Sequence, residues 1–502
     1  MWRKHRISLG FSKIFIRFPN IIVLVPDVEA ISYIGGLSKL DNVKLILKYL
    51  TRKCLKDNGR RIDIALQLYT NTRSNACFTC RHIVYPVVSR VVKMGAESFG
   101  VAEWKMKERF KDPYWRRGLT SVIMGVAKYG VHKPFIPGAP FLVVWDYTYE
   151  CNLKCKHCYS SAGRSLKKEM GREEALKVVS ILGDFGVTSI AFSGGEPLVR
   201  SDIFDVLKLC REYGIFTAIA TNGTTLTREN IEKLKNSGVG YLQISLDGAS
   251  SKTHDSFRGV SGVFDRVIEG IRNAVESGIF VEVATTVTKM NINEVGDIID
   301  LCRKLKVNWF MAYNFIPTGR GREIVNLDLS PIEREKLLKD LWIENLKGEN
   351  LTVLTTAPQF ARVALINSKV NGEATVPTHF YSMKLPGRLV ELSEFVGGCG
   401  AGRSYCAVEP DGSIQPCVFL PVKVGNILID DFEYLWDNDE VFIKLRNKNL
   451  LKGNCGRCRY RYVCGGCRAR AYAYFNDYMA PDPGCIHNAQ YIYQAYMQHS
   501  SS

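Results

Sequence analysis

The chain has 502 residues, of which 46% are hydrophobic and 23% are charged. This length predicts two or three domains, and the hydrophobic content excludes an intrinsically disordered chain. The net charge of +17 favours anionic partners such as phosphorylated substrates, lipid headgroups or nucleic acid, unless the basic residues are simply spread over the surface. The best apolar runs, at residues 21–25 and 141–145, are far shorter than a membrane-spanning helix, so we expect no transmembrane segment.

Residues 1–135 are expected to form an N-terminal extension that is α-rich or mixed. Helical spacing of apolar residues occurs at 43–50 and 119–129. The basic start of the chain is typical of a secretory signal, but Arg17 and Pro19 interrupt the apolar stretch behind it, which favours a cytoplasmic protein. Basic and apolar residues mix between 106 and 126, which suits either contact with an anionic membrane surface or a layer that closes the mouth of the next domain. Three prolines mark the boundary that follows: Pro134, Pro137 and Pro140.

Residues 141–355 alternate short apolar runs with amphipathic stretches. The runs, which predict strands, lie at 141–145, 189–192, 216–220, 241–245, 280–286 and 309–315. Helices are predicted between them at 172–185, 203–213, 228–237, 263–277 and 292–305. Crossovers of this length imply a parallel sheet with helices outside, and about six strand–helix units suit a partial or full barrel. In such sheets the chemistry lies at the carboxyl ends of the strands.

The chain changes character after about residue 390. Residues 391–490 are rich in Cys and Gly, which predicts a small domain organised by metal rather than by a large apolar core. Residues 356–390 fit neither pattern and are expected to bridge the two parts. The chain has 16 cysteines, most of them at ligand spacing, and no export signal is evident, so metal binding is favoured over disulfides.

Three cysteines with the spacing CxxxCxxC follow the first predicted strand: Cys151, Cys155 and Cys158. Thiolates are the usual ligands of iron–sulfur clusters. Three of them can hold three irons of a [4Fe–4S] cubane and leave the fourth iron open for a cofactor, whereas a structural zinc site needs four ligands. We therefore expect a cluster with one open position here.

This trio, with the aromatic Tyr159 after it, resembles the signature of the radical S-adenosylmethionine (radical SAM) superfamily. Further motifs follow in that family's order: Ser-Gly-Gly-Glu-Pro from 193, Ser-Leu-Asp-Gly from 245 and His-Asp-Ser-Phe-Arg-Gly from 254. Each alone also occurs as an ordinary turn, a helix cap or a surface arginine. The resemblance implies a partial (β/α)6-type barrel that binds S-adenosylmethionine through Gly194, Gly195, Glu196, Ser245, Asp247 and Arg258. The glycines and Glu196 would contact the amino group, Ser245 and Asp247 the ribose, and Arg258 the carboxylate; glycine suits the first place because no Cβ bars the ligand.

Eight further cysteines lie in the last part of the chain. Alone, Cys455-x2-Cys458-x5-Cys464-x2-Cys467 is equally typical of a zinc ribbon. With Cys399-x12-Gly412-x4-Cys417 before it and Cys485 after it, the run resembles the SPASM extension of radical SAM enzymes, which implies two auxiliary [4Fe–4S] clusters that transfer electrons. By order, one would be held by Cys399, Cys406, Cys417 and Cys467, and the other by Cys455, Cys458, Cys464 and Cys485. The commonest SPASM form has three residues, not two, before the cysteine equivalent to Cys467.

The remaining five cysteines carry weaker signals. Cys210 and Cys302 lie in helical patterns and are expected to be small core residues. Cys54 with Cys77-x2-Cys80 would suit a metal, but three ligands are too few for a closed site and the sequence shows no fourth.

The resemblance implies an enzyme with three [4Fe–4S] clusters that cleaves S-adenosylmethionine to a 5′-deoxyadenosyl radical, which abstracts hydrogen from an unactivated C–H bond. The basic and partly apolar extension favours a large hydrophobic substrate, such as a membrane-lipid alkyl chain undergoing C–C bond formation. Alternatives are a peptide or protein maturase, an enzyme that modifies tetrapyrroles in a haem-type pathway, and a non-catalytic metal-binding scaffold. We expect a low-potential electron donor such as a ferredoxin or flavodoxin, peripheral membrane association and no nucleic acid. No catalytic side chain is identified from the sequence.

Overall fold

The computed structural model describes residues 41–98, 101–163, 168–348, 350–367, 373–377, 382–386 and 393–490. The apolar run at 21–25, and parts of the predicted extension and bridge, lie outside these residues. Within them no helix is both long and apolar enough to cross a membrane.

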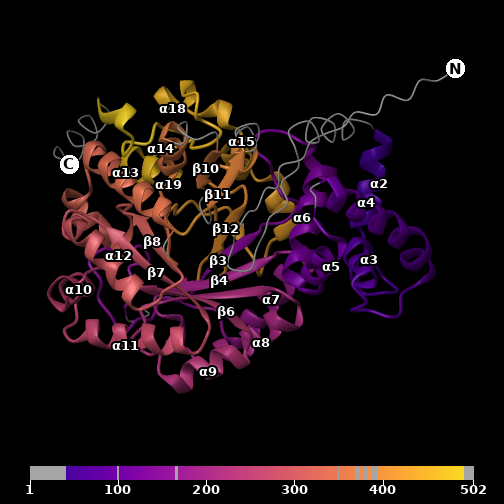
Figure 1. The fold of residues 1–502 in the computed structure, drawn as a ribbon, viewed down its shortest axis with the longest axis horizontal. Helices are drawn as coiled ribbons and strands as arrows, with labels where there is room; N and C mark the ends of the chain where they lie inside the picture. The colour runs from indigo at the N-terminus through magenta and orange to yellow at the C-terminus, as the bar shows by residue number, and fades with distance from the viewer. Residues whose placement is uncertain are drawn as a thin grey trace.

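The described part of the N-terminal extension is a group of helices beside the main sheet (Figure 1). Helix α6 starts at Pro113, where Asp112 accepts a hydrogen bond from the backbone of Tyr114 and caps the helix. An apolar core of its own holds the group together, with Ile62, Leu66 and Val84 fully buried. Its elements are α2 (Asp41–Thr51), β1 (Lys53–Cys54), β2 (Gly59–Arg60), α3 (Arg61–Tyr69), a helical turn (Cys80–Val84) continuing into α4 (Tyr85–Ser98), α5 (Glu103–Lys111) and α6 (Pro113–Tyr129).

The middle of the chain folds as the alternation predicts. Six parallel strands pair in chain order: β3 (Leu142–Thr148), β4 (Ser189–Gly194), β5 (Phe216–Thr221), β6 (Val239–Ser245), β7 (Phe280–Val287) and β8 (Trp309–Asn314). Each matches a predicted run to within a few residues, because continuous apolar runs are what a sheet covered on both faces requires. Helices cover its outer face (Figure 1): α7 (Arg172–Phe185), α8 (Ile203–Glu212), α9 (Arg228–Asn236), α10 (Ser251–Arg258), α11 (Val263–Glu276), α12 (Val295–Lys304) and α13 (Pro331–Lys347).

The sheet is larger than predicted and stays open. A seventh parallel strand, β9 (Thr352–Thr355), extends one edge. At the other edge β12 (Tyr405–Val408) pairs in parallel with β3, followed by β13 (Ser413–Gln415) and β14 (Gly425–Asn426). These ten strands therefore form one sheet with β14 and β9 at its edges, a partial barrel rather than a closed one, while β1–β2 and β10–β11 form separate two-stranded sheets. The cysteine-rich part thus contributes strands to the barrel sheet.

The rest of the C-terminal part lies across one end of the sheet (Figure 1). Its helices are short, and its longest described helix after residue 390 has eight residues, as the weak helical pattern predicts. The elements are α14 (Gln359–Asn367), β10 (Glu373–Pro377), β11 (Ser382–Pro386), α15 (Ser393–Val396), α16 (Phe432–Asn438), α17 (Glu440–Arg446), α18 (Gly453–Arg457) and α19 (Arg468–Phe475).

Candidate active site

The first cysteine group lies in the loop that leaves the carboxyl end of β3. This loop is pinned at both ends, because Cys151 N donates to Gly163 O at 2.9 Å and Lys156 N donates to Phe257 O at 3.0 Å. The thiols of Cys151, Cys155 and Cys158 all line one cavity. The structure therefore brings the predicted trio together at the expected edge of the sheet.

The surroundings of the trio fit an iron–sulfur cluster. Backbone N–H groups of Leu153 and Ala162 donate to the sulfurs of Cys151 and Cys158 at 3.4 and 3.3 Å, an arrangement that stabilises ligating thiolates. Burial raises the pKa of the Cys151 thiol to about 12, so a bound cation is what would keep this sulfur ionised at neutral pH.

Two predicted cofactor residues form a buried ion pair beside the trio. Arg258 Nη2 lies 2.6 Å from Asp247 Oδ2, and Arg258 Nη1 donates to Cys155 Sγ at 3.6 Å. Asp247 Oδ1 accepts the backbone N–H of Thr286 at 2.8 Å, and Asp247 does not line the cavity, whereas Arg258 and Ser245 do. The guanidinium thus brings positive charge to the cysteine loop. The expected contacts of Arg258, Asp247 and Ser245 with S-adenosylmethionine stay predictions.

The Gly-Gly-Glu motif ends β4, but its glycines serve the fold as much as any ligand. Gly194 has φ +107°, and a Cβ there would lie 2.7 Å from Thr148 O, while a Cβ on Gly195 would overlap Glu150 O. Gly195 N and Glu196 N donate to those same carbonyls, both at 2.8 Å. The glycines therefore let the β4 terminus lie against the start of the cysteine loop, a reason that the sequence did not reveal.

Glu196 is turned away from the cavity that the two glycines line. Its carboxylate accepts hydrogen bonds from Thr221 Oγ1 at 2.9 Å and from Asn222 N at 2.7 Å, and so ties β4 to the end of β5. Burial raises the pKa of Glu196 to about 7, although these donors act against it. Its predicted contact with the amino group of the cofactor stays a prediction.

Three of the four cysteines predicted to hold the first auxiliary cluster come together. Cys399, Cys417 and Cys467 pack in one cluster and line the same cavity as the trio. Cys406 lies apart from them in the main sheet core, where the side chains of β12 alternate between faces. Tyr405, its neighbour, points the other way and donates from its hydroxyl to Cys417 Sγ at 3.3 Å. The structure thus does not bring Cys406 to the other three.

The second auxiliary group lies farther from the cavity. Cys455 and Cys485 lie close enough to Cys464 to raise the pKa of its thiol, in addition to the effect of burial, and Cys455 acts likewise on Cys485. Backbone N–H groups donate to the sulfurs of Cys455, Cys458 and Cys464, each at 3.4 Å. None of the four predicted ligands lines the cavity. Cys455 and Cys464 are buried and Cys458 and Cys485 are partly exposed, surroundings that suit a cluster that transfers electrons without contact with a ligand in the cavity.

The cavity itself has a volume of about 1880 Å³ and runs along the inner face of the barrel sheet. At one end lie the cysteine loop and the carboxyl ends of the strands. At the other end lie Ser189 and Phe216, where β4 and β5 begin, together with Leu119 and Val122 of α6. Arg117 fixes α6 against the barrel by donating to three carbonyls, those of Gly183, Val187 and Tyr213, at 2.8–3.0 Å. The extension thus forms part of the cavity wall at the end opposite the cysteine loop, and residues of the mixed segment at 106–126 belong to that wall.

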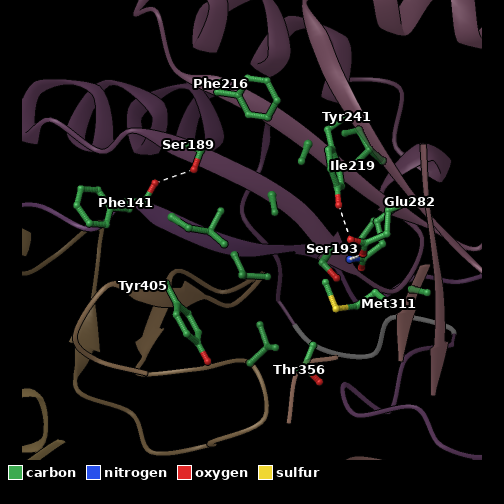
Figure 2. A pocket seen from close by; sticks show the side chains of 18 of the residues that line it. Phe141, Ser189, Ser193, Phe216, Ile219, Tyr241, Glu282, Met311, Thr356 and Tyr405 are labelled. Atoms are coloured by element: carbon green, nitrogen blue, oxygen red, sulfur yellow. Dashed lines mark hydrogen bonds between the residues drawn. The ribbon is translucent and has the colours of Figure 1, made fainter. Parts of the chain in front are cut away.

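A polar group in the cavity wall was missed by the sequence reading. Figure 2 shows Tyr241 and Glu282 pointing at each other from neighbouring strands. Glu282 accepts from Tyr241 at 2.5 Å and from Gln243 Nε2 at 2.5 Å, and Gln243 also bonds to Tyr313. Burial raises the pKa of Glu282 to about 7, while its two donors act against that rise. In the sequence, the only signal for this polar group is a glutamate inside an otherwise apolar strand pattern.

A second missed residue, Arg320, braces the cysteine loop. Its side chain donates to Cys155 O at 3.0 Å and to Ala162 O at 2.5 Å, and its backbone N–H donates to Cys158 O at 3.0 Å. Gly319 before it has φ +55°, and a side chain there would overlap the carbonyl of Tyr159. Arg320 lines the cavity and so adds a second positive charge near the trio.

A parallel half-open barrel with three thiols at its carboxyl edge defines the radical SAM class of enzymes. Comparison with family models agrees: residues 145–302 match the radical SAM superfamily, and residues 399–459 match the SPASM iron–sulfur cluster-binding domain. An AdoMet-dependent heme synthase of Methanosarcina barkeri is 37% identical over 70% of this chain and 97% of its own. An Fe-coproporphyrin III synthase of the same organism is 34% identical over 68% of this chain and 87% of its own.

A solved structure shows the same fold. SuiB of Streptococcus suis, bound to the precursor peptide SuiA, superposes with a TM-score of 0.59 at 18% identity, covering 84% of this chain and 92% of that one. This chain belongs to the radical SAM superfamily, among its members with a C-terminal SPASM domain. It is therefore an enzyme whose cofactors are S-adenosylmethionine and [4Fe–4S] clusters, and the non-catalytic scaffold is excluded.

Proposed function

We propose that this enzyme modifies a tetrapyrrole by radical chemistry. The observation that carries the proposal is one large cavity, about 1880 Å³ in volume, that both the trio and the first auxiliary cysteines line. Cavities for drug-sized ligands are typically about 300–1,000 Å³, so this one has room for a broad macrocycle beside the cofactor. The similarity to a heme synthase and a coproporphyrin synthase supports the tetrapyrrole alternative over the predicted lipid chain.

The walls of the cavity suit a flat apolar ligand with charged edges. Large side chains on several elements line it, namely Trp115, Phe216, Phe280, Trp309 and Phe419. Positive charge is available near both cysteine groups, because Arg320 contacts the trio loop and Arg403 Nη2 donates to Gly397 O at 2.8 Å just before Cys399. Aromatic faces stack on a macrocycle and arginines pair with its carboxylates.

The bound cluster and S-adenosylmethionine supply the radical that attacks a C–H bond of the substrate. The chain's own residues position the substrate: the barrel strands form the wall, and α6 covers part of the far end. Glu282, with a pKa of about 7, can hold or release a proton at neutral pH beside the substrate. Tyr241 and Gln243 fix the direction of its carboxylate.

The test uses the full chain, purified and reconstituted anaerobically with iron and sulfide. The enzyme is incubated with S-adenosylmethionine, a chemical reductant and, in separate arms, Fe-coproporphyrin III, a peptide mixture and archaeal or bacterial lipids. We expect the porphyrin alone to change mass, with 5′-deoxyadenosine formed in step with product. Formation of 5′-deoxyadenosine with an unchanged porphyrin and a modified peptide or lipid would replace the proposed substrate and leave the enzyme class intact.

The remaining expectations on partners carry over to this function. A low-potential ferredoxin or flavodoxin is the expected electron donor, and the cytoplasm the expected compartment. Peripheral membrane association rests only on the basic, partly apolar extension, and nucleic acid is not expected as a partner. Replacing the chemical reductant by a reduced ferredoxin in the same assay tests the donor.

A further inference from the structure

Four side chains of the N-terminal helical group converge at one buried point: Cys54, Asp57, Cys77 and Cys80. One ligand atom from each lies within 4.8 Å of those of the other three. Cys54 Sγ is 3.6 Å from Cys77 Sγ and 3.4 Å from Asp57 Oδ2. The three cysteines lacked a fourth ligand in the sequence, and the fold supplies it as Asp57. The group lies outside both segments that match the family models.

The local backbone presents these ligands as two pairs, each with two residues between its members. Cys54 and Asp57 come from the β1–β2 hairpin, which turns at Asn58 with φ +50°. Cys77 precedes the helix that continues into α4, and Cys80 lies in its first turn. Cys77 N donates to Asp57 Oδ1 at 2.9 Å, which joins the hairpin to the helix start. Pairs with this spacing are typical of structural zinc sites.

The burial of the group is hard to explain by packing alone. Cys80 and Cys54 sit against Ile64 in a small apolar cluster, and Asp57 is only 9% exposed. Arg73, whose guanidinium lies 3.5 Å from Asp57 Oδ1, is the one cation that the described residues pair with this carboxylate. Arg73 compensates the carboxylate, but the thiolates that would ligate a metal carry further negative charge, which costs free energy when buried unless a cation balances it. A metal ion at the centre of the four ligands would supply that charge.

The spacing of the ligands indicates a single ion rather than a cluster. A tetrahedral zinc ion with Zn–S bonds of about 2.3 Å places its sulfurs roughly 3.8 Å apart. Each ligand of a [4Fe–4S] cubane binds a different iron, so its sulfurs spread wider. Among the described residues, the eleven cysteines assigned to clusters form no group this compact. A disulfide between Cys54 and Cys77 would leave Cys80 and Asp57 without a role.

We propose that Cys54, Asp57, Cys77 and Cys80 bind one Zn²⁺ ion in a closed, four-coordinate structural site. The ion ties the hairpin to the start of α4, in a part of the chain with a small core, where metal binding contributes directly to folding. Helix α3, which packs beside the site, carries Asp63, and Asp63 pairs with Arg116 of α6 at 2.9 Å. The site therefore supports α6, the helix that lines one end of the cavity.

The experiment measures zinc and iron in the full chain after anaerobic reconstitution of its clusters. We expect about one zinc per chain in the wild type and its loss in Cys80→Ala, with iron unchanged. Cys210→Ala is the matched control, because Cys210 is equally buried in a helix but belongs to no ligand group, and it should keep both metals. X-ray absorption at the zinc edge should show about three sulfurs near 2.3 Å and one oxygen near 2.0 Å.

A further variant separates ligation from packing. Asp57→Cys should keep the zinc, now bound by four sulfurs. If Asp57 served only to accept the hydrogen bond from Cys77, this variant would not keep the metal. Wild type with filled clusters but no zinc, zinc retained in Cys80→Ala, or a Cys54–Cys77 disulfide found by mass spectrometry would each overturn the proposal. Loss of iron instead of zinc in Cys80→Ala would also overturn it. If the variants do not fold, the X-ray absorption spectrum of the wild type alone tests the proposal.

Discussion

Different interactions stabilise the barrel and its contact with the cysteine-rich part. In the barrel, the strands bury Val143, Ile190, Leu242 and Val283 completely, so apolar burial stabilises it. Where the C-terminal part meets the barrel, a network of fully buried arginines adds charge pairs to the apolar packing. Asp328 accepts from Arg334 at 2.6 Å, from Arg470 at 2.5 Å and from Tyr474 at 2.7 Å, and Arg470 also reaches Asn314 at the end of β8.

This difference has a functional consequence. Burial alone would raise the pKa of Asp328, but Arg470 and Arg334 beside it hold that pKa below its usual value. A charged network of this kind fixes one orientation between two parts, because each member loses its partner if the parts slide. The barrel thus provides the cavity, and the network fixes Cys467, three residues from Arg470, against it.

The largest expected effect separates the roles of the two regions. Cys155→Ala should lower 5′-deoxyadenosine formation about a thousandfold or more, because the trio is predicted to hold the cluster that cleaves the cofactor. Cys464→Ala should leave that cleavage largely intact and stop product formation, since the auxiliary clusters are expected to transfer electrons. Both rates are followed by liquid chromatography with mass spectrometry.

Cys302→Ala is the control for both variants, because Cys302 is a buried helical cysteine outside the cavity. Equal loss of cofactor cleavage in Cys155→Ala and Cys464→Ala would remove the distinction between the two regions.

The next effect concerns stability. Asp328→Asn leaves Arg470 and Arg334 buried without their anion, which should cost about 3–5 kcal/mol in free energy of unfolding. The exposed pair of Arg228 and Glu276 is the matched control, and Glu276→Gln should cost less than about 1 kcal/mol. Denaturant unfolding under anaerobic conditions measures both. Similar costs for the two variants would contradict the view that buried charge holds the C-terminal part against the barrel.

The alternation of strands and helices was predictable because apolar periodicity is local. All six predicted strands and five helices of the barrel are present. Strand β12 was not predictable: Tyr405–Val408 is four residues long, and its partner β3 lies more than 250 residues earlier. Its pleat decides that Tyr405 faces Cys417 while Cys406 does not, so the structure does not bring Cys406 to the three cysteines with which motif order groups it.

The candidate site shows the same division. The trio and the Gly-Gly-Glu motif are contiguous in sequence and were found from spacing. The other residues depend on contacts that sequence spacing does not define. Glu282 and Arg320 contact residues that are distant in sequence. Asp57 contacts Cys77 only because the hairpin turns toward it. Asp57 lies only three residues after Cys54, yet a lone aspartate in a basic segment gives no signal until the hairpin brings it to Cys77.

A smaller expected effect is a pH dependence of stability that depends on Glu282 in the barrel wall. Folded Glu282 binds its proton more tightly than the unfolded chain does, with a pKa of about 7 against 4.5. Its contribution to stability is therefore fully present below pH 4.5 and is lost as pH rises to about 7, a change of about 3 kcal/mol. Glu282→Gln should lack this loss, so calorimetry should show it gaining stability relative to wild type from pH 5 to pH 8. Asp300→Asn, on the surface, should show no such trend.

The smallest expected effect is electronic and belongs to the auxiliary region. Tyr405 donates a hydrogen bond to Cys417 Sγ at 3.3 Å, and such bonds raise the reduction potential of a cluster by stabilising its more negative state. Tyr405→Phe keeps the ring and removes the donor, so the potential of that auxiliary cluster should fall by on the order of tens of millivolts. Redox titration followed by electron paramagnetic resonance measures it, with the exposed Tyr434→Phe as control. An unchanged potential would contradict a role for Cys417 as a cluster ligand, whereas a shift confined to one auxiliary cluster would support it.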